Sequence, residues 1–135
     1  MIEMWKILPE KQIGDFQISH FEIEECHVTA LLLKDILDHR SEYTKLRPGK
    51  FVRLCKKGSI IMSDMPMEYQ TNSEFIQNAH GDVLIAGLGI GLVLIAVQDN
   101  LEVKTITIIE RHQEIIDLIF PHLPIKKQCK VVCEK

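Results

Sequence analysis

The sequence has little of what marks a membrane, secreted or nucleic-acid-binding protein. Its longest run of apolar residues and glycines, residues 83–97, is 15 residues long, whereas a membrane-spanning helix needs about 20. The N-terminal stretch MIEMWKILPEKQIGDF carries acids and a proline where a signal peptide has its apolar core. A net charge of −3 gives no general attraction to nucleic acid. We therefore expect a cytoplasmic chain with neither a membrane nor a nucleic-acid partner.

Paired metal-ligand spacings are also missing. The four cysteines, Cys26, Cys55, Cys129 and Cys133, are scattered, and without a signal peptide we expect them to be reduced. Cys129 and Cys133 fall on one face of an expected strand, but no CxxC or HxxxH accompanies them. We interpret them as small apolar strand residues and predict no metal site.

Cations are concentrated in one place, the stretch KLRPGKFVRLCKK at 45–57, which has six. Such a cluster could form a local nucleic-acid surface. The interpretation we favour is a solvated hairpin edge, because Lys and Arg discourage pairing between exposed strands.

The hydrophobic pattern changes type near residue 80 and predicts two parts. The first part, 1–80, is expected to be a small β-rich and helical segment, with strands in 14–25, a helix over 25–40, a hairpin over 50–64 that bends near Lys57 and Gly58, and a helix or irregular segment over 66–79. The second part, 81–135, is expected to alternate strands at 83–87, 105–110 and 130–135 with helices at 91–98 and 111–123.

This alternation of buried strands and helices is typical of a parallel sheet with helical crossovers. Doubly wound sheets have more strands than the second part supplies. We therefore expect an α/β fold with a truncated parallel sheet. The chain is then either a fragment of a longer protein, which we favour, or a domain that another chain completes. The exposed strand edges of such a sheet also predict a homo-oligomer.

The segment GLGIG places glycines at 87, 89 and 91, between an expected strand and an expected helix. Glycine tolerates the positive φ of a tight strand-to-helix turn, and its missing side chain lets a ligand lie against the backbone. Tight helix–strand packing can demand the same residues. A nicotinamide dinucleotide fingerprint needs its third glycine at position 92, and Leu92 there disfavours that cofactor.

Glu110 ends the expected strand TITIIE, nineteen residues after Gly91. A carboxylate at the carboxyl end of the second strand faces the ligand crevice and can accept hydrogen bonds from both ribose hydroxyls. It could instead stabilise the start of the following helix. The glycine turn at a matching distance favours the cofactor role.

Residues 60–124, which contain SDMPMEY, GLGIG and TITIIE, resemble the spermidine synthase-like branch of the S-adenosylmethionine-dependent methyltransferase fold. The G-x-G-x-G spacing resembles motif I of that fold. The resemblance implies a Rossmann-like methyltransferase fold that binds S-adenosylmethionine or its decarboxylated form. The implied cofactor-binding residues are Gly87, Leu88, Gly89 and Gly91 over the cofactor, Glu110 on the ribose, and Arg111 or His112 beside the adenine.

The chain also departs from the family pattern. Ile85 and Ile90 occupy positions where members carry acids, so the turn has no carboxylate for the cofactor's ammonium group. Backbone carbonyls could serve the ammonium group, or Asp64 and Glu68 could fold over the site, which we state as a hypothesis. The two acids could equally be polar residues around a proline turn. No catalytic base is identified, because the family's catalytic loops would follow Lys135.

The leading expectation is thus an S-adenosylmethionine-binding, methyltransferase-like protein, a transferase if it is an enzyme, with an unidentified acceptor. An aminopropyltransferase is one alternative, which Ile90 disfavours. The other is a catalytically degenerate binding or interaction module, since a fold does not determine a function.

Overall fold

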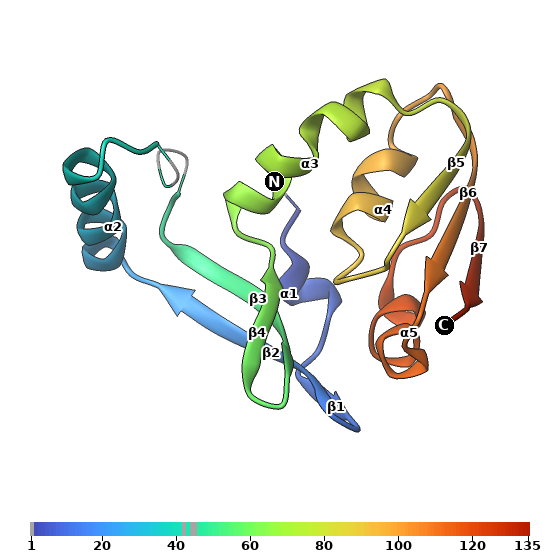
Figure 1. Ribbon diagram of the computed structural model, residues 1–135, viewed down its shortest axis with the longest axis horizontal. Helices are drawn as coiled ribbons and strands as arrows, with labels where there is room; N and C mark the ends of the chain where they lie inside the picture. The colour runs from blue at the N-terminus through green and yellow to red at the C-terminus, as the bar shows by residue number, and fades with distance from the viewer. Residues whose placement is uncertain (1, 42, 44–45) are drawn as a thin grey trace.

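Two β-sheets of different kinds organise the computed structural model, which describes residues 2–41, 43 and 46–135 (Figure 1). One sheet is antiparallel with strand order β1-β2-β3-β4, and the other is parallel with order β5-β6-β7. The elements in chain order are α1 (Met4–Ile7), β1 (Lys11–Ile13), β2 (Phe16–Ile23), α2 (Glu25–Leu37), β3 (Gly49–Lys56), β4 (Ser59–Ser63), α3 (Pro66–Asn78), β5 (Gly81–Ala86), α4 (Leu92–Gln98), β6 (Val103–Glu110), α5 (Gln113–Ile119), a 3-10 turn (Phe120–His122) and β7 (Gln128–Cys133).

The antiparallel sheet is centred on the β2–β3 pair, which runs in register from Phe16 opposite Lys56 to Ile23 opposite Gly49. β3 turns into β4 at Lys57 and Gly58, whose φ angles of 50° and 81° are both positive. Positive φ at both central residues is the turn geometry that matches the twist of a hairpin. The predicted hairpin and its bend are therefore confirmed.

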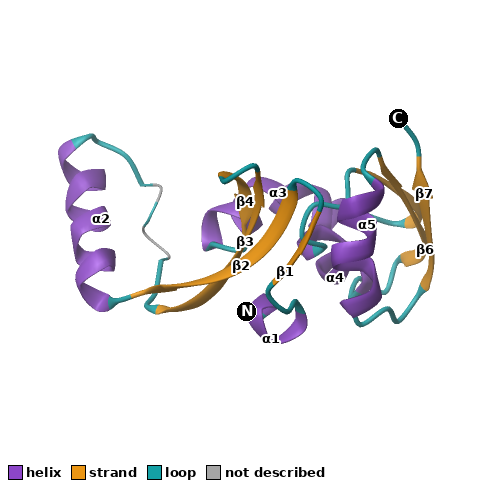
Figure 2. Ribbon diagram, turned by 90° about the horizontal axis from the view of Figure 1, so that it is seen from below, coloured by secondary structure: helices purple, strands orange, loops and turns teal. Residues whose placement is uncertain are grey.

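Helix α2 leaves this sheet between β2 and β3 and projects away from the rest of the molecule (Figure 2). A second, smaller core joins it to β2 and β3, and its buried members are Ile23, Val28, Leu46 and Phe51. Apolar side chains on its outer side stay exposed, among them Ile36 and Leu37.

The parallel sheet has α4 and α5 on the same face, the face turned toward the antiparallel sheet (Figure 2). The buried side chains Val83 and Ile85 of β5 and Ile106 and Ile108 of β6 join one core, which continues into β2, β3 and α1. Because this core crosses residue 80, the two predicted parts pack as one body. The predicted boundary itself stays a prediction.

The predicted strands and helices are confirmed, with ends that differ by a few residues. The sequence reasoning missed α1 and β1. It was wrong about the cationic stretch, because β3 is an inner strand of its sheet and not an edge; Lys45 in that stretch lies outside the described residues. The Nζ atom of Lys50 on β3 lies 4.8 Å from the centroid of the Trp5 ring, which is a cation–π contact.

Within the described residues, no helix is both long and apolar enough to cross a membrane.

Candidate functional site

The glycine turn follows β5 directly and leads into α4. Gly87, Gly89 and Gly91 have φ angles of 92°, 55° and 82°, a region that side chains disfavour. The Gly87 N–H donates to the carbonyl of Ile109 on β6 at 2.8 Å, so the start of the turn is anchored to the sheet. The predicted need for glycine at all three positions is confirmed.

The three glycines differ in what faces them. A Cβ on Gly89 would lie 2.5 Å from the Met62 sulfur, and a Cβ on Gly91 would lie 2.6 Å from a methyl carbon of Leu123. At Gly87, no described atom beyond its chain neighbours would lie within 4 Å of a Cβ. Close packing thus accounts for two of the glycines, and Gly87 is the one that presents bare backbone to open space.

Glu110 connects the end of β6 to this turn. Its Oε2 accepts a hydrogen bond from the Leu88 N–H at 2.9 Å, and its Oε1 accepts one from the His112 N–H at 3.0 Å. The residue is 5% exposed. The sequence left two roles open for Glu110, one as an acceptor for the ribose of a cofactor and one at the start of α5. The bond from the His112 N–H places the carboxylate at the start of α5, and the ribose role stays a prediction. An ionised carboxylate has about four acceptor positions, of which these bonds use two.

The two residues after Glu110 have different surroundings. The His112 ring lies with Nδ1 3.4 Å from Glu110 Oε1, and it packs against Phe16 of β2 with ring centroids 4.9 Å apart. Arg111 is exposed. Of the two candidates for the adenine side of the site, His112 is therefore the one beside the carboxylate.

A cavity of about 510 Å³ adjoins the turn. It extends along β5 and under α3, and its lining is mainly apolar, formed by Met62, Asn72, Phe75, Leu84, Ile85, Ala86, Gly87, Leu88, Gly89, Leu92 and Val93. Its volume lies within the range of about 300–1,000 Å³ typical of small-molecule sites. The polar groups in this lining are the backbone of the turn and the amide side chain of Asn72.

Asp64 lies in a different place from the one hypothesised. Its Oδ1 accepts a hydrogen bond from the Val52 N–H at 2.8 Å, and it lines a separate cavity of about 110 Å³ beside Trp5 and Lys50. Burial raises the pKa of the Asp64 carboxyl above its ordinary value, although hydrogen bonds from backbone N–H groups oppose this. The structure thus gives Asp64 a role in holding β3 against β4, and neither Asp64 nor Glu68 lines the cavity at the turn.

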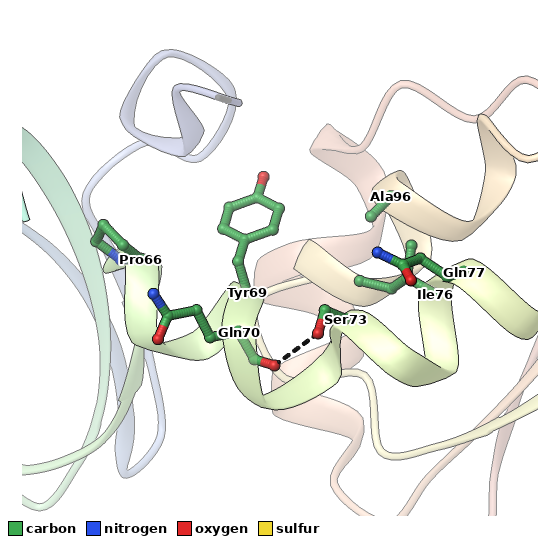
Figure 3. A pocket seen from close by; sticks show the side chains of 7 residues that line it. All are labelled: Pro66, Tyr69, Gln70, Ser73, Ile76, Gln77 and Ala96. Carbon is green, nitrogen blue, oxygen red and sulfur yellow. Dashed lines mark hydrogen bonds between the residues drawn. The ribbon is translucent and has the colours of Figure 1, made fainter. Parts of the chain in front are cut away.

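A further cavity of about 570 Å³ lies between α3 and α4 (Figure 3). Ser73 in its lining already makes a hydrogen bond, because the Ser73 hydroxyl donates to the backbone carbonyl of Gln70 at 2.9 Å. The Tyr69 hydroxyl is buried and meets no hydrogen-bond partner among the described residues. Burial raises the pKa of the Tyr69 hydroxyl above its ordinary value. Among the described residues, the lining of this cavity holds no carboxylate or imidazole.

The structure therefore brings Gly87, Leu88, Glu110 and His112 together at the carboxyl ends of β5 and β6 and places Asp64 elsewhere. Sequence reasoning missed Met62, which faces both Gly89 and the cavity. Comparison of the chain with protein-family models, curated proteins and solved structures finds no match.

Proposed function

We propose that the chain binds S-adenosylmethionine, or its decarboxylated form, at the turn 87–91 and Glu110, as the cofactor-binding part of a Rossmann-like, methyltransferase-like protein. One observation carries the proposal. The carboxylate that ends β6 is hydrogen-bonded to the turn that ends β5, and ligands of open parallel sheets bind at the carboxyl ends of neighbouring strands.

The residues present suit parts of such a cofactor. Gly87 leaves backbone uncovered at the start of the turn, which permits close approach of a ligand. Two backbone N–H groups and the His112 ring already lie against the Glu110 carboxylate, which leaves about one of its four acceptor positions for a ribose hydroxyl group. The cofactor would supply a methyl group on a positively charged sulfur. The contribution of this chain would be to hold that group in a fixed orientation for attack by an acceptor.

Transfer of an aminopropyl group is the less favoured variant of this function. The aspartate that aminopropyltransferases carry within the turn would stand at Ile90, and this side chain is fully buried in the core. A ligand at the turn therefore cannot contact position 90 without rearrangement of the core.

A second candidate is a module that keeps the turn only to hold its fold together. Two features favour it: both Glu110 oxygens already accept backbone hydrogen bonds, and the residue is 5% exposed. In that case the protein would interact through its surface and bind no nucleotide.

Calorimetric titration distinguishes these candidates. S-adenosylmethionine, S-adenosylhomocysteine, decarboxylated S-adenosylmethionine and NAD are titrated separately into the native chain. The key variant is Glu110→Gln, and Glu102→Gln is its matched control, because Glu102 is an exposed glutamate that directly precedes β6, at the end opposite Glu110. Circular dichroism checks that each variant is folded.

The proposal predicts that S-adenosylmethionine binds the native chain and Glu102→Gln equally and binds Glu110→Gln at least about tenfold more weakly, which is one lost hydrogen bond to a charged group. If the native chain binds none of the adenosyl compounds, the module is favoured. Equal binding by the two variants would refute the assignment of Glu110.

A further inference from the structure

Three metal-ligating side chains gather at the start of α2, far from the glycine turn. Glu24, Cys26 and His27 are all exposed, and their ligand atoms lie within 4.8 Å of one another. The donors are a carboxylate oxygen, a thiol sulfur and an imidazole nitrogen.

The local backbone fixes this arrangement. The Glu24 N–H donates to His27 Nδ1 at 3.2 Å, and the Glu24 side chain in turn accepts from the His27 backbone, so the two residues form a capping box. The Cys26 thiol donates to Glu24 Oε2 at 3.7 Å. The three side chains are therefore already gathered at the first turn of the helix.

The spacing is close to that of ligands around one ion. Tetrahedral Zn²⁺ holds sulfur at about 2.3 Å and nitrogen or oxygen at about 2.0–2.2 Å, which puts the ligand atoms roughly 3.5 Å from one another. The sulfur and the carboxylate oxygen already have this separation. Rotation of the exposed imidazole would bring its nitrogen into the same sphere, at the cost of the hydrogen bond from Glu24.

We propose that Glu24, Cys26 and His27 form a surface site for a borderline-soft divalent cation of the Zn²⁺ class, with water as the fourth ligand. Thiolate and imidazole select such ions over Mg²⁺ and Ca²⁺, which prefer oxygen ligands. The carboxylate and the thiolate together balance the charge of the ion. They also lie at the N-terminus of the helix, where the helix dipole favours negative charge. The site lies on a different element from Glu110 and does not depend on the proposed function.

Titration with Co²⁺, a spectroscopic substitute for Zn²⁺, tests this site on the full chain under anaerobic, reducing conditions. A cobalt–thiolate bond gives a charge-transfer band in the near ultraviolet, which reports cysteine ligation directly. Zn²⁺ added afterwards must remove the band by displacement.

The test uses two variants that each remove one proposed ligand and one control variant. Cys26→Ser removes the sulfur and keeps the size of the side chain. His27→Gln removes the imidazole but keeps a residue suited to the third helical position of a capping box. Cys133→Ser removes the other exposed thiol, on β7, and serves as the matched control.

We expect the band in the native chain and in Cys133→Ser, its loss in Cys26→Ser, and at least about tenfold weaker Co²⁺ binding in His27→Gln. Binding must also weaken as the pH falls, because the thiol loses a proton when the metal binds. Absence of the band at millimolar Co²⁺, its loss in Cys133→Ser, or unchanged binding in His27→Gln would overturn the proposal.

Discussion

Gly91→Ala is expected to destabilise the protein much more than Gly87→Ala, although both glycines lie in the same turn. Each has a positive φ, 82° and 92° respectively, so each substitution carries a backbone cost of about 1–2 kcal/mol. The two positions differ in their surroundings, which makes the pair an internal control.

The added methyl group has room only at position 87. On Gly91 it would lie 2.6 and 2.8 Å from the two methyl carbons of Leu123 and 3.3 Å from its Cγ. Leu123 is buried, so it has little freedom to move away, and overpacking of this kind adds about 1–3 kcal/mol. Gly91→Ala should therefore cost about 2–5 kcal/mol in total, against about 1–2 kcal/mol for Gly87→Ala.

Urea unfolding followed by circular dichroism measures the difference. With a slope of about 2 kcal/mol per molar urea, the additional cost lowers the midpoint of Gly91→Ala by about 0.5–1.5 M relative to Gly87→Ala. A double-mutant cycle with Leu123→Ala identifies the cause, because the methyl group introduced by Gly91→Ala would occupy space that Leu123 vacates. Equal midpoints for the two glycine variants, or strict additivity in the cycle, would refute this account of the turn.

Three further predictions concern buried polar groups. Glu110→Ala leaves the Leu88 and His112 N–H groups without their acceptor. The free energy of unfolding, measured in urea, should fall by about 1–3 kcal/mol for each group, and amide exchange should be faster at both. A total loss below about 1 kcal/mol would contradict these two hydrogen bonds. The folded-state pKa of Asp64 is raised above its ordinary 3.8, so the contribution of this carboxyl to stability is present below pH 3.8 and is lost as the pH rises through the raised value. The stability of Asp64→Asn relative to the native chain should therefore increase over that window in urea unfolding. A constant or opposite difference would show that the pKa is not raised. Tyr69→Phe removes a buried hydroxyl that has no hydrogen-bond partner among the described residues. The unfolding free energy of this variant should therefore stay within about 0.5 kcal/mol of the native value or rise. A loss above about 1 kcal/mol would indicate a hydrogen bond, for example to the nearby backbone of Ile2.

Properties set by local backbone conformation could be predicted from the sequence. The positive φ angles of the GLGIG turn follow from its tightness, and the bend of the hairpin follows from Gly58, which tolerates a positive φ between two apolar runs. The parallel strands were predictable because their apolar runs are strong and their lengths suit strands.

Properties set by distant segments could not be predicted in the same way. Met62 and Leu123 approach the turn from β4 and from beyond α5, and no spacing within GLGIG indicates them. The position of β3 inside its sheet depends on its pairing with β2 across the α2 segment. Likewise, the sequence shows that Asp64 is an acid near a proline, but its burial depends on the packing of α1 and β3 around it.

The pairing of Ile23 with Gly49 has a consequence for protein engineering. The chain leaves the antiparallel sheet after Ile23 and returns at the opposite residue, so residues 24–48 form an insertion whose two ends are already adjacent. A short turn could join β2 to β3 in their place, at the cost of uncovering Phe51, and the entropy of closing a loop changes only slowly with its length. The α2 segment is thus a position where peptides of unrelated sequence could be grafted while the strand register on either side is kept.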